Sequence, residues 1–255
     1  MVRTRIIPTL LLRNESLVKT VKFGKFSYIG DPCNAVRIFN ELEVDELVFL
    51  DILASPRGTE PNYKLLRDIA DECFMPMGYG GGIKTAEQAH KIFSIGFEKV
   101  FLNTSIVNNP NLIEQISTAY GSQATAVSID VKKNIFGNYK VVTCGGRKRT
   151  ALDPVIWAKE AEKMGAGEIL LTAVDCEGTW QGMDCDLISK VSSAVNIPVI
   201  AQGGAGNIGD IGEGIDRGGA SAVALGSMVV FQKQGMGVLV NFPDKKLIEV
   251  ELGKH

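Results

Sequence analysis

DELVFLDILASPRG (residues 45–58) and GEILLTAVDCEG (residues 167–178) share one pattern, in which a short apolar run leads into an acidic loop. Asp51 and Asp175 correspond in this pairing and lie 124 residues apart. Such similarity at long range is the mark of an internal repeat. The two stretches therefore suggest that the chain contains two related halves.

Two further pairs of segments support a duplication. GGGIK resembles GGAGN, with Gly81 matching Gly204, and KVFLNTS resembles AVALGSM, with Asn103 matching Gly226. Both offsets are 123 residues, within one residue of the first. Duplication of a half with four strands gives eight strands, enough to close a parallel sheet into a barrel.

Short apolar runs alternate with amphipathic stretches along the chain, the pattern of a parallel sheet covered by helices. We expect one domain over residues 1–255, a (β/α)8 TIM barrel made of two similar half-barrels. A β-hairpin is expected at 132–150. The expected strands are 5–10, 46–50, 77–79, 99–102, 125–130, 168–172, 198–201 and 222–225, and helices are expected at 33–43, 86–95, 110–120 and 154–164.

Composition excludes several classes of protein. The chain has 255 residues, 45% of them hydrophobic, and a formal net charge of −2, so no general attraction to nucleic acid is expected. The N-terminal apolar run is too short and interrupted for a signal peptide or membrane span, which favours a cytoplasmic protein without a membrane partner. Five scattered cysteines do not suggest disulfides. With only two histidines, we expect no metal, and no cofactor is predicted.

Glycine-rich loops after two strands predict phosphate sites, because glycine lets the backbone N–H groups approach an anion. The structural alternative is that these glycines only form tight turns. Repetition of each loop with a polar partner downstream favours the phosphate interpretation. The predicted contacts are Gly81, Gly82, Asn103 and Thr104 in the first half, and Gly204, Gly226 and Ser227 in the second.

The segments RIIPTLLLRNESLVKTVKF, GGGIK, FLNTS, VSIDVKK and ILLTAVDCEGTWQGMD resemble the cyclase subunit of imidazole glycerol phosphate synthase over almost the whole chain. The resemblance implies a lyase-type synthase subunit that binds a phosphorylated small molecule and receives ammonia from a glutaminase-type partner in a heterodimer. It implies catalytic roles for Lys19, Asp130 and Glu177, of which Glu177 replaces the family's usual aspartate. It also places Thr172 in the substrate site.

Leu11 departs from the family pattern, which has an aspartate at this position of the first strand. The family mechanism uses two carboxylates as general acid and base, and leucine cannot transfer a proton. Without a substitute, the loss is expected to slow the reaction by about 10²–10⁴-fold. A slow but authentic cyclase of histidine biosynthesis is the alternative.

Charged residues begin four expected strands, so their side chains should meet at the opposite end of the barrel. They match the family's gate to its ammonia passage, whereas unrelated solvated charges are the alternative. Buried charges need partners, which favours a paired ring. The four residues are Arg5, Glu46, Lys99 and Glu168.

A branch of the family resembles this chain more closely, in EVDELVFLDI, ECFMP and VSIDVKKNIFGNYKV. It serves acetamidino-sugar synthesis for surface polysaccharide or glycoprotein, where an ATP-dependent amidotransferase is thought to take part. Catalysis by Asp130 and a noncatalytic ammonia conduit both remain open. A third interpretation takes Arg147, Lys148 and Arg149 as a nucleic-acid patch, although basic residues in one loop more often face solvent or an anionic substrate.

Overall fold

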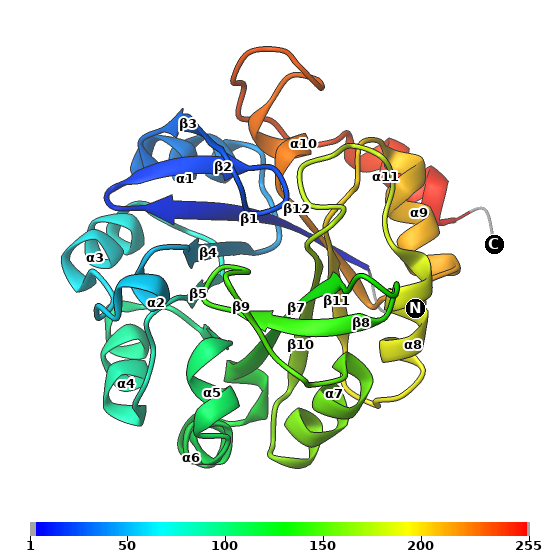
Figure 1. Ribbon diagram of the computed structural model, residues 1–255. Helices are drawn as coiled ribbons and strands as arrows, with labels where there is room; N and C mark the ends of the chain where they lie inside the picture. The colour runs from blue at the N-terminus through cyan, green and yellow to red at the C-terminus, as the bar shows by residue number, and fades with distance from the viewer. Residues whose placement is uncertain (1–3, 254–255) are drawn as a thin grey trace.

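Eight parallel strands close into a barrel in the computed structural model, which describes residues 4–253 (Figure 1). Each strand pairs with the next in the order around the barrel, including β7 with β10, and β12 pairs with β1 to complete the circle. The predicted TIM barrel is confirmed. In order around the barrel the strands are β1 (Arg5–Arg13), β4 (Leu47–Asp51), β5 (Met77–Gly80), β6 (Lys99–Leu102), β7 (Thr125–Lys133), β10 (Glu168–Ala173), β11 (Val199–Gln202) and β12 (Ala222–Leu225).

Helices surround the barrel, and most of them begin at a side-chain cap. Asp153, for example, accepts hydrogen bonds from Val155 N and Ile156 N, and Pro154 occupies the first turn. All four predicted helices are present, each within two residues of the expected ends. The surrounding helices are α1 (Pro32–Glu41), α3 (Tyr63–Glu72), α4 (Ala86–Ile95), α6 (Asn111–Tyr120), α7 (Pro154–Lys163), α8 (Cys185–Ser192) and α9 (Ile208–Asp216), with α11 (Lys245–Leu252) against α9.

Two hairpins extend from the carboxyl ends of barrel strands. The predicted one joins β7 to β8 (Tyr139–Thr143) and β9 (Lys148–Arg149). The other, which the sequence analysis missed, joins β1 to β2 (Ser16–Thr20) and β3 (Phe26–Gly30). Short helical turns also occur: α2 (Ala54–Arg57), α5 (Thr104–Asn108), η1 (Ser122–Ala124) and α10 (Ser227–Val230).

The duplicated segments occupy equivalent places in the barrel. Asn103 links β6 to α5, and Gly226 links β12 to α10. Their backbone angles are similar, with φ −135° and ψ −87° at Asn103 and φ −105° and ψ −83° at Gly226. The sequence repeat is therefore also a repeat of local structure.

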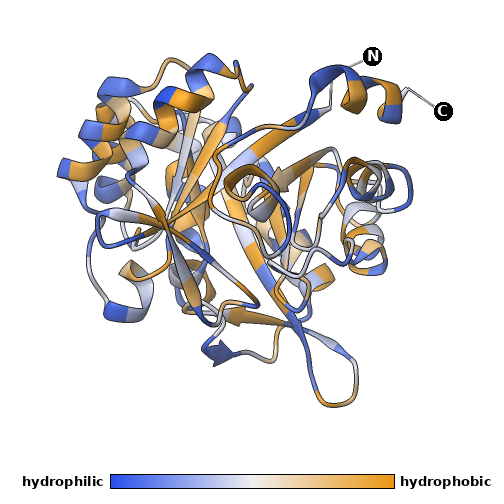
Figure 2. Ribbon diagram, turned by 90° about the horizontal axis from the view of Figure 1, so that it is seen from above, coloured by the Kyte–Doolittle hydropathy of each residue, from blue (hydrophilic) through white to orange (hydrophobic). Residues whose placement is uncertain are grey.

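Two apolar cores follow from the alternation of side chains along each strand. The larger core lies between strands and helices, and Figure 2 shows hydrophobic stretches on the strands with mixed hydropathy along the helices. The smaller core fills the barrel interior and includes Ile7, Val48, Phe101 and Leu170. Among residues 4–253 no helix is long and apolar enough to cross a membrane.

Candidate active site

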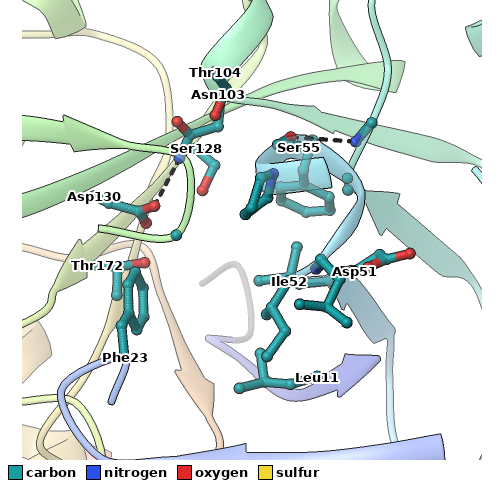
Figure 3. Close-up of a pocket in the computed structure, with 18 of the residues that line it drawn as sticks. Leu11, Phe23, Asp51, Ile52, Ser55, Asn103, Thr104, Ser128, Asp130 and Thr172 are labelled. Atoms are coloured by element: carbon teal, nitrogen blue, oxygen red, sulfur yellow. Dashed lines mark hydrogen bonds between the residues drawn. The ribbon is translucent and has the colours of Figure 1, made fainter. Parts of the chain in front are cut away.

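A cavity of about 350 Å³ opens at the carboxyl ends of the barrel strands. Parts of both hairpins border it, including Phe23 and Gly145, and its floor reaches Phe101 in the barrel interior. Figure 3 shows side chains from several strands converging on this space. Active sites of TIM barrels lie at this end of the barrel.

Asp130, near the end of β7, is the buried carboxylate of the cavity. Asn103 Nδ2 donates a hydrogen bond to Asp130 Oδ2 at 2.8 Å. Burial raises the pKa of Asp130 to about 6, although hydrogen bonding by Asn103 and Thr172 keeps the pKa lower than burial alone would. A carboxyl group with this pKa can accept or donate a proton near neutral pH.

Leu11 lines the same cavity from β1, across the open space from Asp130 (Figure 3). It is buried and pairs in register with Leu50 of β4 and Val18 of β2, so apolar side chains surround it. Leucine at this position leaves β1 without a proton-transferring group in the cavity, as expected from the sequence. The structure accordingly places an aliphatic wall where β1 enters the cavity.

Asp51 is a second carboxylate on the cavity wall, to which the sequence analysis assigned no role. It lies at the end of β4, and its Oδ1 accepts hydrogen bonds from Leu53 N at 2.8 Å and Ala54 N at 3.0 Å. Partial burial raises its pKa above the usual value, against these two hydrogen bonds. The repeat had singled out Asp51, but only the cavity showed where its side chain lies.

The first predicted phosphate cradle lies on the cavity wall. Gly81, Gly82, Asn103 and Thr104 all line the cavity. Gly81 has φ +129°, and a Cβ atom there would lie 2.7 Å from the carbonyl oxygen of Asp51. Glycine is therefore required both by conformation and by space.

The second predicted cradle is separate from this cavity. Gly204, Gly226 and Ser227 do not line it, although the repeat placed them in an equivalent loop pair. Gly226 instead packs against Lys19, since a Cβ atom at Gly226 would lie 2.8 Å from Lys19 Cε. Only the first cradle therefore faces the cavity in this structure.

Lys19 of β2 and Glu177 form a buried ion pair that ties the β2–β3 hairpin to the loop after β10. The Glu177 carboxylate also accepts hydrogen bonds from Thr20 Oγ1 and Phe23 N, each at 3.1 Å. Phe23 has φ +59°, an uncommon backbone conformation for a residue other than glycine. Burial lowers the pKa of Lys19. The geometry shows Glu177 organising the hairpin, with its oxygens already occupied.

The four charged residues at the strand starts form a closed ring of ion pairs. Arg5 contacts both Glu46 and Glu168. Lys99 Nζ lies 2.9 Å from Glu46 Oε1 and 2.6 Å from Glu168 Oε2. Each carboxylate thus bridges both cations. The two glutamates are almost fully buried, and this reciprocal pairing satisfies them.

Two arginines also reach the cavity wall. Arg13, at the end of β1, stacks its guanidinium 3.8 Å from the ring centre of Phe26, a cation–π contact. Arg147 comes from the turn before β9, whereas Lys148 and Arg149 lie within β9 and do not line the cavity. The position of Arg147 favours contact with an anionic ligand. Nothing in the sequence except its charge pointed to Arg13 as a cavity residue.

The chain is a (β/α)8 barrel with a cavity at the carboxyl ends of its strands and a ring of ion pairs at the opposite end. These features define a class of (β/α)8 proteins. A family model described as histidine biosynthesis protein matches residues 5–234, and the chain belongs to this family. It is 48% identical over 98% of its length to all of the "Putative imidazole glycerol phosphate synthase subunit hisF2" of Pseudomonas aeruginosa. It is 41% identical to the "Imidazole glycerol phosphate synthase subunit HisF" of Alkaliphilus metalliredigens, over 89% of this chain and 90% of that relative.

Proposed function

We propose that this chain is the ammonia-receiving barrel subunit of a glutamine-dependent synthase, working in the cytoplasm with a glutaminase-type partner. The observation that carries the proposal is the placement of the ring and the cavity on the same strands. β6 has Lys99 in the ring and leads directly to Asn103 in the cavity. Relatives named as synthase subunits support an assembly with a second chain.

Asp130 is the principal acid or base in this proposal. It lies where a reacting amine or carbonyl in the cavity can reach it, and a pKa of about 6 leaves both protonation states populated near neutral pH. Asn103 orients the carboxylate by donating to Oδ2. Lys19 and Glu177 hold the hairpin that covers the site.

The first cradle and Arg147 serve the anionic part of the substrate. Backbone N–H groups beside Gly81 and Gly82, with the side chains of Asn103 and Thr104, offer donors on one wall. Arg147 adds a positive charge on the hairpin. Gly204, Gly226 and Ser227 take a second anionic group of the substrate in this proposal. Thr172, which lines the cavity, contacts the substrate there.

The substrate we favour is an acetamidino-sugar precursor rather than the ribonucleotide of histidine biosynthesis. Leu11 supports this choice, because an aliphatic side chain faces Asp130 across the cavity where the cyclases carry a second carboxylate. In the proposed pathway, ammonia converts an N-acetyl group into an acetamidino group. An ATP-dependent amidotransferase activates the acetyl oxygen as a leaving group.

Authentic cyclisation is the second candidate, and Asp51 is the observation that favours it. This carboxylate lines the cavity next to Ile52, and its pKa is raised by burial, so it could supply the missing acid. A conduit without chemistry is the third candidate. The polar lining around Asp130 weighs against it, because a conduit needs no oriented carboxylate.

An ammonia-dependent assay tests these candidates. The purified chain is given the histidine-pathway ribonucleotide with ammonium salt at high pH, which bypasses any glutaminase. We expect little cyclised product, and robust turnover would make the chain an authentic cyclase. The parallel assay supplies the amidotransferase, ATP and an N-acetylated anionic sugar. If Asp130→Asn matches the wild type there, the conduit replaces the catalytic proposal.

A further inference from the structure

Strand β6 connects the ionic ring to the cavity through one intervening side chain. Lys99 belongs to the ring, Asn103 lines the cavity, and Phe101 lies between them on the same inward face. Alternate residues of a barrel strand share a face, and four residues of strand span about 13 Å. A small molecule that crosses the barrel from the ionic ring to the cavity must therefore pass Phe101.

Phe101 belongs to both regions that it separates. It is buried in the interior core with Ile7, Val48 and Leu170, and its ring also forms part of the cavity floor. The interior at this level is apolar. An ammonium ion would lose its hydration here without gaining a counter-charge, whereas neutral ammonia would lose much less.

Gly78 of β5 leaves the space that the Phe101 ring fills, and Gly80 leaves room for the Phe101 Cβ atom. A Cβ atom at Gly78 would overlap Cε2 of that ring and lie 3.2 Å from Cδ2. A Cβ atom at Gly80 would lie 2.9 Å from Phe101 Cβ. Gly78 does not have a positive φ, so space rather than backbone conformation requires glycine there. The bulky Phe101 side chain is thus complementary in shape to the side-chain-free backbone at Gly78 and Gly80.

Thr9 supplies an independent polar feature on the same interior face. It lies on β1 between Ile7 of the interior core and Leu11 of the cavity wall. Its buried hydroxyl has no hydrogen-bond partner within residues 4–253. Buried hydroxyl groups are normally paired, so this one is suited to a small polar guest.

We propose that Phe101 is the constriction that controls passage through the barrel, with its ring held against Gly78 and turning within the interior core to let ammonia pass. This inference rests on the proposed transfer of ammonia from the ionic ring to the cavity. At rest the Phe101 side chain closes the apolar part of the barrel interior. It thereby prevents water and ions from passing between the ionic ring and the cavity. The Thr9 hydroxyl hydrogen-bonds to ammonia in transit.

The first test uses the complex with its glutaminase partner and compares glutamine-dependent with ammonium-dependent turnover. Gly78→Ala takes space that the Phe101 ring already fills and pushes that ring toward the barrel axis, so we expect the ratio of the two activities to fall about tenfold. Adding Phe101→Ala to Gly78→Ala should restore the ratio, because the smaller side chain reopens the path. A fall without rescue, or equal loss of both activities, would overturn the proposal.

Xenon binding to crystals of the full chain tests the constriction without any reaction. Xenon occupies apolar cavities that are large enough to hold it. In the wild type we expect no xenon between the ionic ring and the cavity. In Phe101→Ala we expect xenon in the space that the Phe101 side chain has left. Xenon sites along the wild-type axis would show that Phe101 closes nothing. A wild-type complex without glutamine-dependent turnover would instead reject the proposed function, and xenon would still decide the role of Phe101.

Discussion

Asn103 donates a hydrogen bond to Asp130 between neighbouring strands, with Nδ2 2.8 Å from Oδ2. The bond stabilises the charged carboxylate and opposes the effect of burial on the pKa of Asp130. Because β6 and β7 pair in fixed register, the barrel itself sets this geometry.

Replacing Asn103 with Leu should raise the pKa of Asp130 further above its present value of about 6. A hydrogen bond to a charged group contributes about 1.5–3 kcal/mol, so we expect a rise of about one unit or more. Carboxyl carbon NMR titration of the labelled chain measures this without an activity assay. Asn109→Leu is the matched control and should leave the titration unchanged. An Asp130 pKa unaffected by Asn103→Leu would exclude the assigned hydrogen bond.

Replacing Asp130 with Asn should stabilise the fold more at pH 7 than at pH 4. The folded pKa of Asp130, about 6, lies above the usual unfolded value of about 3.9. Its contribution to stability is therefore present below pH 4 and lost as pH rises through 6. The loss by pH 7 is about 3 kcal/mol. Urea unfolding of both proteins at pH 4, 5 and 7 gives the difference, and a pH-independent difference would contradict the buried carboxyl.

The barrel strands and helices could be predicted because local pattern determines them. Alternating apolar runs and capping residues such as Asp153 act over a few residues. The β2–β3 hairpin was missed because it has a long turn and buries Lys19 against Glu177, 158 residues away. A contact at that separation leaves no local signal. The four charges at the strand starts could be placed together because the starts of parallel barrel strands lie at the same end of the barrel. Asp51 and Arg13, in contrast, could be identified as cavity residues only from the geometry of the loops.

Replacing Lys99 with Ala should impair glutamine-dependent activity while affecting ammonium-dependent activity much less, since free ammonia can enter the open mouth. The change leaves Glu46 and Glu168 to share Arg5 alone, so some loss of stability is also expected because two buried carboxylates then have one cation. Arg5→Ala should act in the same direction. The exposed Arg37→Ala, which breaks the surface pair with Glu72, is the control and should change neither activity. Equal losses in both assays would assign the ring to stability alone.

Crystals grown in phosphate or sulfate should show an anion beside Gly81 and Gly82 with Asn103 and Thr104. A second anion should bind near Gly204 with Gly226 and Ser227, if Lys19 withdraws from Gly226 when the ligand enters. Electron density at both loops checks the prediction. Anions bound elsewhere, with both loops empty, would leave the glycines as tight turns only. Occupancy of the first loop alone would support a substrate with one anionic group.

Replacing Leu11 with Asp should raise any trace of cyclase activity, because it places a carboxylate across the cavity from Asp130. The gain should be modest. Leu50 and Val18 flank the position and would raise the pKa of the new carboxyl group by desolvation. Ammonium-dependent cyclisation is compared among wild type, Leu11→Asp and Leu11→Asn, which matches the shape without the charge.

The double variant Leu11→Asp/Asp130→Asn separates the two carboxylates. If a pair of acids performs cyclisation, the double variant should lose what Leu11→Asp gained, because one carboxylate cannot both donate and accept in the same step. A wild type already as fast as Leu11→Asp would show that Leu11 marks no change of function. In that case Asp51, on the neighbouring strand, becomes the candidate for the second acid, and histidine biosynthesis replaces sugar modification as the proposed role.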